Sequence, residues 1–413
     1  MDLVIAMRRG LVGLLALLAL FLTGCGDFVP SPIGTNSAGL LVVTLDSQGN
    51  YLSWTSGEEG VKLYLTDSQG SFLQEIPVPV ETGFIGWPQL TPDGQRVVYL
   101  IAEEVHEEEG FIGTYIKVDR WGIHQVDLES GSDERLVETA NDILSLQLEP
   151  TGERLAYLEV SELPDELECP QTGAVKIFND FKLQILSLAE PGAQPEEIAT
   201  GVLAYRWARD GGSLLLLEEE FSWCGDGSSE DQLGFTLASL SRYDFRDGEP
   251  AKEKLIELIP DPMALLSGLL LPQLVLDWTS REEIFITLAP PILGAANPEE
   301  VNWQLYSLDP YYDEVTFIAD RAFYPAVSPD EERLAFIEET DPDDRKRTVW
   351  MRNIVDPDVQ LKRVAGPGCY SQLFWASEEE LGYVEEVEDA QIIWIYNLKT
   401  GKTFNLSAAL ARR

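Results

Sequence analysis

The feature that most constrains this chain is a turn that returns seven times along the sequence and is followed each time by a short apolar strand. The clearest copies are TPDGQRVVYL, which begins at Thr91, and SPDEERLAFI, which begins at Ser328. Weaker copies begin at Asp46, Glu149, Ala208, Thr279 and Ala376. Pro-Asp-Gly steps supply the residues that tight turns need, including Gly where φ is positive. A repeat of about 45 to 70 residues with four strands in each unit predicts a β-propeller.

Each repeat can be divided into four expected strands, a to d. In the first repeat they cover 40–44, 51–54, 61–66 and 72–76. The third strand recurs in later repeats, for example as FKLQILSL from Phe181, with the alternating apolar residues of a half-buried strand. Seven repeats predict an all-β fold, a single propeller of seven blades with four antiparallel strands each. A propeller of six or eight blades is the alternative, because the first and last repeats are the least regular and could share a blade.

The size of the chain is compatible with this fold, and its charge limits the kinds of partner that it can bind. At 413 residues the chain exceeds the usual single-core domain, but propeller blades pack mainly on their neighbours, so one closed domain can reach this length. The 71 acidic and 29 basic residues give a formal net charge of -42. Such a surface repels phosphate backbones, so no nucleic-acid partner is expected. Two interpretations of the acidic charge remain open: it simply keeps the surface solvated, or it attracts cations and basic partners.

The N-terminal segment resembles a bacterial lipoprotein signal peptide. Arg8 and Arg9 precede an apolar run over 11–22 that is too short to span a bilayer comfortably. The sequence LTGC follows and ends at Cys25. It resembles the lipobox, in which the cysteine is acylated and becomes the first residue of the mature protein. An ordinary secretory signal with a chance cysteine is the alternative.

With the repeats, this resemblance leads us to expect three segments: a signal peptide over 1–24, the lipidated cysteine with a flexible tether over 25–38, and the propeller over 39–413. The tether is rich in Pro, Gly, Ser and Asn and lacks periodicity. Acyl chains such as palmitate contribute about 0.8 kcal/mol per buried methylene, so two or three chains on Cys25 would hold the protein stably on a lipid bilayer. The expected location is extracytoplasmic, on the outer leaflet of the cell membrane or on the outer membrane.

The turn-and-strand repeats resemble the WD-like repeats of the TolB-type propeller family. The resemblance covers most of residues 39–405 and implies the propeller architecture. The arrangement differs from that of TolB-type proteins with an α/β domain ahead of the propeller, because the tether here leads directly into the first repeat.

Catalytic motifs are almost absent from the sequence. His106 and His124 have no motif context, and there is no nucleophile elbow, zinc-binding helix or Gly-rich phosphate loop. No catalytic residue, cofactor or metal site is therefore predicted. The innermost strands are mostly apolar and aromatic, with Asp277 as their one acid. This pattern favours a binding or scaffold module for a protein, peptide or glycan. The alternative is a lactonase- or glycan-lyase-like enzyme with a site at the centre of the funnel.

Blades 2 to 5 carry long b–c segments, which should share one face of the propeller: 101–122, 158–180, 218–233 and 288–302. Long loops on a rigid scaffold are common places for binding residues, although tolerated insertions are the alternative.

Three cysteines remain beyond the lipobox. An exported chain occupies a compartment that permits disulfides. Cys169 and Cys224 lie in the b–c segments of neighbouring blades 3 and 4, which predicts a disulfide between them and leaves Cys369 single.

An apolar partner-binding patch is predicted where the segment 261–273, DPMALLSGLLLPQ, approaches the segment 288–298, LAPPILGAANP. An exposed apolar patch of this kind often marks an interaction site. Its expected residues, with their aromatic rim, are Met263, Leu266, Leu270, Trp223, Phe111 and Trp121. The alternative is that the leucines fold inward as a short helix that closes the mouth of the propeller.

Overall fold

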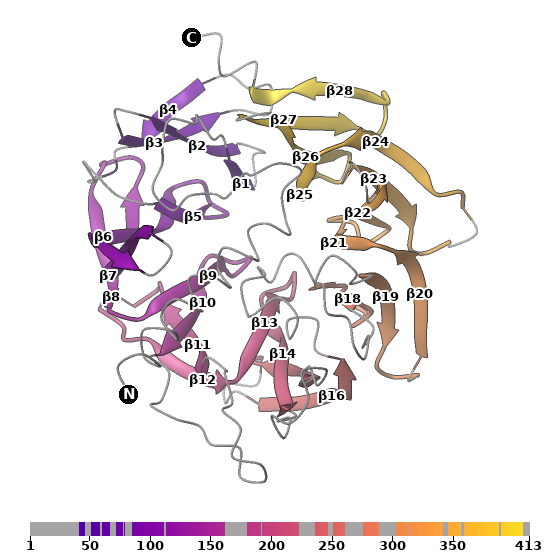
Figure 1. Ribbon diagram of the computed structural model, residues 1–413, viewed down its shortest axis with the longest axis horizontal. Helices are drawn as coiled ribbons and strands as arrows, with labels where there is room; N and C mark the ends of the chain where they lie inside the picture. Colours follow the sequence, from indigo (N-terminus) through magenta and orange to yellow (C-terminus); the bar gives the residue numbers. More distant parts are fainter. Residues whose placement is uncertain are drawn as a thin grey trace.

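The computed structural model shows seven four-stranded antiparallel sheets arranged as a ring, viewed along its axis in Figure 1. The residues that the structure describes are 41–45, 51–57, 60–66, 72–76, 78, 85–110, 113–161, 180–190, 192–222, 236–246, 251–260, 276–288, 303–312, 314–341, 346–356, 359–387 and 390–407. The prediction of a seven-bladed all-β propeller is confirmed.

Each blade consists of four strands that are consecutive in the chain, so the first and last repeats do not share a blade. Blade 1 has β1 (Leu41–Leu45), β2 (Tyr51–Gly57), β3 (Gly60–Thr66) and β4 (Phe72–Ile76). Blade 2 has β5 (Ile85–Leu90), β6 (Arg96–Gly110), β7 (Gly113–Asp127) and β8 (Asp133–Thr139). Blade 3 has β9 (Asp142–Leu148), β10 (Arg154–Ser161), β11 (Asp180–Ser187) and β12 (Glu196–Thr200). Blade 4 has β13 (Val202–Trp207), β14 (Ser213–Ser222), β15 (Thr236–Asp244) and β16 (Ala251–Pro260).

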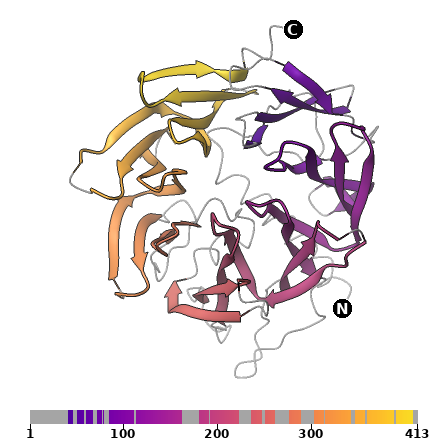
Figure 2. The same cartoon turned by 180° about the vertical axis from the view of Figure 1, so that it is seen from behind.

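The remaining blades repeat the pattern. Blade 5 has β17 (Leu276–Trp278), β18 (Ile284–Leu288), β19 (Gln304–Asp309) and β20 (Glu314–Asp320). Blade 6 has β21 (Ala322–Val327), β22 (Arg333–Asp341), β23 (Lys346–Asn353) and β24 (Lys362–Gly368). Blade 7 has β25 (Tyr370–Ser377), β26 (Glu380–Val387), β27 (Ala390–Asn397) and β28 (Lys402–Asn405). Contacts between β1 and β27 join blade 7 to blade 1, and both views show the closed ring (Figures 1 and 2).

The repeated turn has the same hydrogen bonds in distant blades. The Thr91 hydroxyl donates to Asp93 and accepts the Arg96 N–H at 3.0 Å, and the Asp93 carboxylate accepts the Gln95 N–H at 3.0 Å. Ser328 and Asp330 repeat these bonds in blade 6: the Ser328 hydroxyl accepts the Arg333 N–H at 2.9 Å. Short polar side chains that bond to nearby backbone are what such turns require. The turn therefore connects strand a to strand b in the same way in these repeats.

Aromatic and amide side chains on the innermost strands tie neighbouring blades together. Trp207 donates its indole N–H to the carbonyl of Gln147 at 3.2 Å, and Trp278 donates in the same way to the carbonyl of Trp207 at 3.2 Å. Trp375 repeats the bond to Ala326 at 2.9 Å. A buried indole N–H needs such an acceptor. The tryptophan at or near the end of these three inner strands is thus a connector between blades.

The hydrophobic core lies between the blades. One cluster of buried residues joins blades 3, 4 and 5, a second joins blades 1 and 2, and a third joins blades 2 and 3. Strand β14 has fully buried leucines from Leu214 to Leu217, so both of its faces are covered. Among the described residues, no helix is both long and apolar enough to cross a membrane.

Candidate functional site

Most residues predicted from the sequence to form a site lie outside the part of the chain that the structure describes. These are Cys25, the pair Cys169 and Cys224, and the patch residues Phe111, Trp223, Met263, Leu266 and Leu270. Cys369 is described, is half-buried and forms no disulfide with another described residue. The lipidation, the disulfide and the apolar patch stay predictions.

Trp121 does not contribute to an exposed rim. Its side chain is only 8% exposed and packs in the core cluster between blades 2 and 3. The indole N–H donates to Asp142 at 3.0 Å. The rim expectation was wrong for this residue because Trp121 sits within a strand, where it pairs with Ala102, and not in a loop.

The b–c segment of blade 2 is a β-hairpin, which corrects the expectation of a loop over 101–122. Strands β6 and β7 have 15 residues each and pair from Arg96 opposite Asp127 as far as Gly110 opposite Gly113. The other described strands have ten residues or fewer. The register shifts twice near the middle: Glu103 of β6 is the extra residue between the pairs at Ala102 and Glu104, and Asp119 of β7 is the extra residue between the pairs at Glu104 and Val105. Such β-bulges redirect a side chain and are common next to functional sites.

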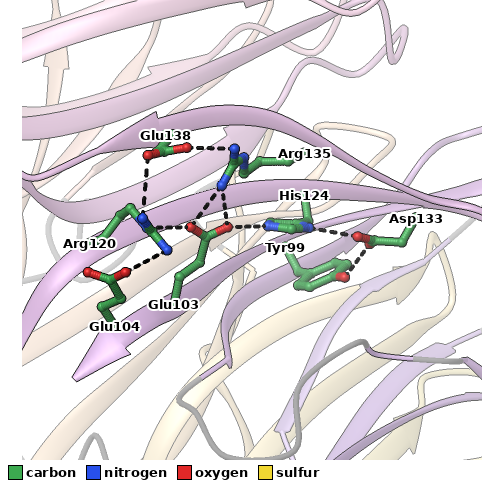
Figure 3. Close-up of polar contacts among 8 residues, drawn as sticks. All are labelled: Tyr99, Glu103, Glu104, Arg120, His124, Asp133, Arg135 and Glu138. Carbon is green, nitrogen blue, oxygen red and sulfur yellow. Dashed lines mark hydrogen bonds and ion pairs between the residues drawn. The ribbon is translucent and has the colours of Figure 1, made fainter.

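The bulge places Glu103 at the centre of a polar network on three strands of blade 2 (Figure 3). His124 on β7 lies between two carboxylates: its Nε2 is 3.0 Å from Glu103 and its Nδ1 is 2.8 Å from Asp133 on β8. Tyr99 on β6 donates its hydroxyl to the other oxygen of Asp133 at 2.5 Å. The Tyr99 and His124 rings stack with centroids 5.7 Å apart. We refer to these residues, with the arginines described next, as the blade 2 network.

Two arginines complete the network on its outer side. Arg120 Nε donates to Glu103 at 2.9 Å, and its Nη2 lies 2.8 Å from Glu104. Arg135 Nη1 lies 3.2 Å from Glu103, and its Nη2 lies 2.6 Å from Glu138. Glu103 therefore accepts from three donor side chains. Its own side chain is 14% exposed and that of His124 is 10% exposed, whereas both arginines reach solvent.

The absence of a side chain at Gly122 makes room for the contact between Glu103 and His124. A Cβ at Gly122 would lie 2.7 Å from Glu103 Oε1 and 2.8 Å from His124 Nε2, both closer than a methyl group tolerates. Gly122 is opposite Ile101 on the neighbouring strand. A glycine inside a strand often marks such a close approach.

The electrostatics of the network favour an ionised Glu103 and a neutral Tyr99. Burial raises the pKa of Glu103, but the hydrogen bond from His124 and the charges of Arg135, His124 and Arg120 outweigh it, so the pKa lies below its ordinary value. Burial and the neighbouring Asp133 raise the pKa of Tyr99 well above its ordinary value.

In this arrangement the polar atoms of His124 and Tyr99 already have partners within the protein. Both nitrogens of His124 lie within hydrogen-bond distance of carboxylates, so neither is open to a substrate. The Tyr99 hydroxyl is committed to Asp133. The network instead joins β6, β7 and β8 at the base of the long hairpin.

Asp277, the one acid expected on the inner strands, is also committed to the fold. It is 3% exposed and accepts the backbone N–H groups of Trp278 at 2.9 Å and Val327 at 2.8 Å. Arg206 of blade 4 lies 3.3 Å from the same carboxylate. Asp277 therefore connects blades 4, 5 and 6. Within the described residues, no group of three or more His, Cys, Asp or Glu side chains could hold a metal ion.

The sequence reasoning missed the blade 2 network. Glu103 and His124 are 21 residues apart and meet only if the segment between them forms a hairpin. One signal was available in GTYIKVDRW, from Gly113, where β-branched and aromatic residues indicate a strand.

Comparison with known proteins identifies the fold but no family. No family model matches the chain, and no curated protein matches it. The β-propeller domain of the Trilobed protease from Pyrococcus furiosus matches with a TM-score of 0.56 and 14% identity, over 90% of this chain and 98% of that one. The uncomplexed Pyrococcus horikoshii acylaminoacyl peptidase gives the same score and identity, over 90% of this chain but 52% of the peptidase. An oligogalacturonate lyase in complex with manganese gives 0.51 at 13% identity, over 86% and 88% of the two chains.

These similarities establish the propeller fold alone, because the identities are low. The chain spans about half of the peptidase, which is a longer protein. A putative TolB from Agrobacterium tumefaciens is similar over 69% of this chain with a TM-score of 0.41, too low to argue from. Membership of the TolB-type family stays a prediction.

Proposed function

We propose that this chain is an extracytoplasmic lipoprotein, anchored to a bilayer by acylated Cys25, whose propeller binds a protein, peptide or glycan partner. The anchor is supported by the basic residues, apolar run and LTGC sequence at the N-terminus. The binding role is supported by the shape of blade 2. No further membrane contact is needed for this proposal.

The observation that carries the binding role is the braced hairpin of β6 and β7. In an antiparallel blade the a–b and c–d turns share one face of the ring, and the b–c and d–a connections share the other. The hairpin therefore projects from the face on which the long b–c segments of blades 3 to 5 also begin. Val105 and His106, just beyond the bulge, are exposed. A rigid arm loses less conformational entropy on binding than a mobile loop does.

The bonding of the polar groups in the scaffold favours a binding module over a propeller enzyme. In the blade 2 network and around Asp277, the ionisable side chains are bonded to one another or to backbone. A propeller enzyme needs a base or nucleophile with a free lone pair near the substrate. The ionisable groups of the blade 2 network and Asp277 instead form hydrogen bonds and ion pairs within the propeller.

Site-specific photo-crosslinking in the native envelope tests the binding role. A photoreactive phenylalanine analogue replaces Val105 on the hairpin or, as a matched control, Val359 in the c–d connection on the opposite face. Both positions are exposed, at 38% and 50%. We expect a discrete crosslinked product from position 105 and none from position 359. No product from 105, or the same product from both positions, would contradict a partner on this face.

Replacement of Cys25 by Ala tests the anchor independently. Metabolic labelling with an alkyne-bearing palmitate should mark the unchanged protein and should be lost completely in Cys25→Ala, together with processing at this site. Unchanged acyl labelling of the variant would disprove lipidation at Cys25 and would leave the crosslinking result unaffected.

A further inference from the structure

Among the described strands, the outermost strand of every blade pairs on one side only. Strands β4, β8, β12, β16, β20, β24 and β28 each end their sheet, and no other described strand pairs with their outer side. The free N–H and C=O groups of such an edge can accept a strand from another chain. Natural proteins discourage this pairing with charged side chains, with proline or with very short edge strands.

Six of the seven edges carry one of these safeguards. Five of them expose a charged side chain at an inner position of the strand: Glu75 in β4, Arg135 in β8, Glu197 in β12, Lys254 in β16 and Arg363 in β24. The sixth, β28, is only four residues long.

Strand β20 of blade 5 carries none of them. Its charged residues, Glu314 and Asp320, are the first and last of the strand. Between them, Val315 and Phe317 are 60% and 50% exposed. Among the residues whose side-chain exposure the structure describes, β20 is the one outer strand with two exposed large apolar side chains. It lies at the periphery of the ring in Figure 1.

The turn before β20 adds two exposed aromatic rings and is held in place. Tyr311 and Tyr312 are 69% and 81% exposed. Asp309 accepts both of their backbone N–H groups, at 2.9 and 3.2 Å. The hydroxyl of Tyr311 is hydrogen-bonded to Glu282 and Arg242, and the bond to Glu282 is the main reason that its pKa is raised. The aromatic pair therefore extends the apolar surface of the edge in a fixed position.

The first half of the edge strand, Glu314–Phe317, pairs regularly with β19, and a β-bulge follows at Ile318. Val315 pairs with Leu308 and Phe317 pairs with Tyr306 across the sheet. The Tyr306 and Phe317 rings meet edge to face with centroids 5.8 Å apart. Val315 and Phe317 consequently lie on one face of the strand, spaced as alternate residues.

We propose that β20 binds an extended segment of a protein partner, which adds to blade 5 as a fifth strand. The matching segment has apolar residues at alternate positions, to cover Val315 and Phe317, and Lys or Arg near its ends, to meet Glu314 and Asp320. Backbone hydrogen bonds provide affinity in this mode and alternate side chains provide specificity. The net charge of -42 attracts such a basic segment.

The same charge disfavours the two other occupants of the edge. Two copies of this chain repel each other before their edges meet. A membrane surface with anionic lipids repels the acidic ends of β20 in the same way. The proposed site lies on the outer edge of blade 5 and is separate from the hairpin of blade 2, so it does not depend on the binding role proposed above.

Two synthetic peptides of equal charge test this proposal. The peptide KVTVTFK can pair along β20, whereas KVPVPFK has the same charge but lacks the N–H groups that pairing needs. Binding is measured by calorimetry, and the site by hydrogen exchange of the amides in 314–320. We expect KVTVTFK to bind at least tenfold more tightly than KVPVPFK and to slow exchange in β20.

Matched variants separate the edge from general charge attraction. Val315→Lys with Phe317→Lys should weaken KVTVTFK binding at least tenfold. Leu73→Lys with Phe404→Lys makes the same charge change on the exposed apolar residues of two other outer strands and should change binding less than twofold. Circular dichroism checks that both variants fold.

Several results would overturn the proposal. These are equal binding of the two peptides, equal loss in the two double variants, or no protection of β20 at millimolar peptide. A dimer of the unchanged protein at micromolar concentration that the Val315→Lys, Phe317→Lys variant abolishes would identify a second copy as the occupant. Binding to phosphatidylglycerol vesicles that is lost in that variant alone would identify a membrane.

Discussion

Blades 2 and 5 start from similar turns, that of blade 5 being one residue shorter, and differ in the length and exposure of their strands. The Thr91 hydroxyl of blade 2 accepts the Arg96 N–H at 3.0 Å, and the Thr279 hydroxyl of blade 5 accepts the Glu283 N–H at 3.2 Å. Blade 2 then builds two 15-residue strands around a polar network, whereas blade 5 has a three-residue inner strand, β17, and an outer strand with exposed apolar residues.

This difference shows where a propeller repeat is constrained. Near the axis every blade must match its neighbours, and the Trp278 indole and the Asp277 carboxylate make bonds to adjacent blades. Away from these inner contacts the blades diverge, so a blade can extend a hairpin from one face or expose its outer edge without disturbing the ring. The two surfaces that we propose for partners are both at such places.

The largest effect is expected from removing the centre of the blade 2 network. Glu103→Ala leaves the partly buried His124 and two arginines without their shared acceptor, which should lower the free energy of unfolding by about 2–3 kcal/mol. Urea denaturation measures the change. The matched control Glu104→Ala removes an exposed contact to Arg120 and should cost less than about 0.5 kcal/mol. Equal effects of the two variants would show that the network does not stabilise blade 2.

The rim of blade 5 should be far less sensitive to substitution. Phe317→Ala removes a half-exposed ring, so the cost should stay below about 1 kcal/mol, well under that of Glu103→Ala. The same urea measurement checks this value. A loss as large as that of Glu103→Ala would mean that β20 is part of the core and is not a free edge.

An effect between those of Glu103→Ala and Phe317→Ala is expected from filling the space beside Glu103. Gly122→Ala places a methyl group against Glu103 and His124 and should cost about 1–2 kcal/mol, because the acid can shift only by weakening its other bonds. The double variant with Glu103→Ala should lose less than the sum of the two single variants. Strict additivity would show that the glycine and the acid do not share a contact.

The smallest effect concerns pH. Because the pKa of Glu103 lies below its ordinary value in the folded protein, its ionised form stabilises the fold above the unfolded-state value, and this stabilisation is lost as pH falls through the folded value. The stability difference between the unchanged protein and Glu103→Ala should therefore be constant at neutral pH and shrink below about pH 4.5. Urea midpoints from pH 7 to pH 3 measure it. A difference that grows on acidification would contradict the assigned charge states.

The blades could be predicted from the sequence because their turns are local. Thr91 and Asp93, or Ser328 and Asp330, make their hydrogen bonds within five residues, so each copy of the motif is readable on its own. Seven copies gave seven blades. The strand bounds were close for the same reason: the second strand of the first repeat was expected at 51–54 and is found over Tyr51–Gly57.

The blade 2 network could not be predicted in this way. Its contact between Glu103 and His124 depends on the register of β6 and β7 and on the bulge that turns Glu103 toward the histidine. In a chain with 71 acidic residues, no single carboxylate stands out by sequence. The exposed edge of β20 depends likewise on which strand lies outermost and on what covers it, and neither follows from local pattern.

Hydrogen exchange of the hairpin tests the central claim most directly, namely that the blade 2 network holds β6 and β7 as a rigid arm. Amides in 104–110 and 113–119 should exchange slowly in the unchanged protein. In Glu103→Ala they should exchange at least tenfold faster, while amides in 96–100 near the base remain protected. Rapid exchange of the hairpin in the unchanged protein, or no change in Glu103→Ala, would contradict the account.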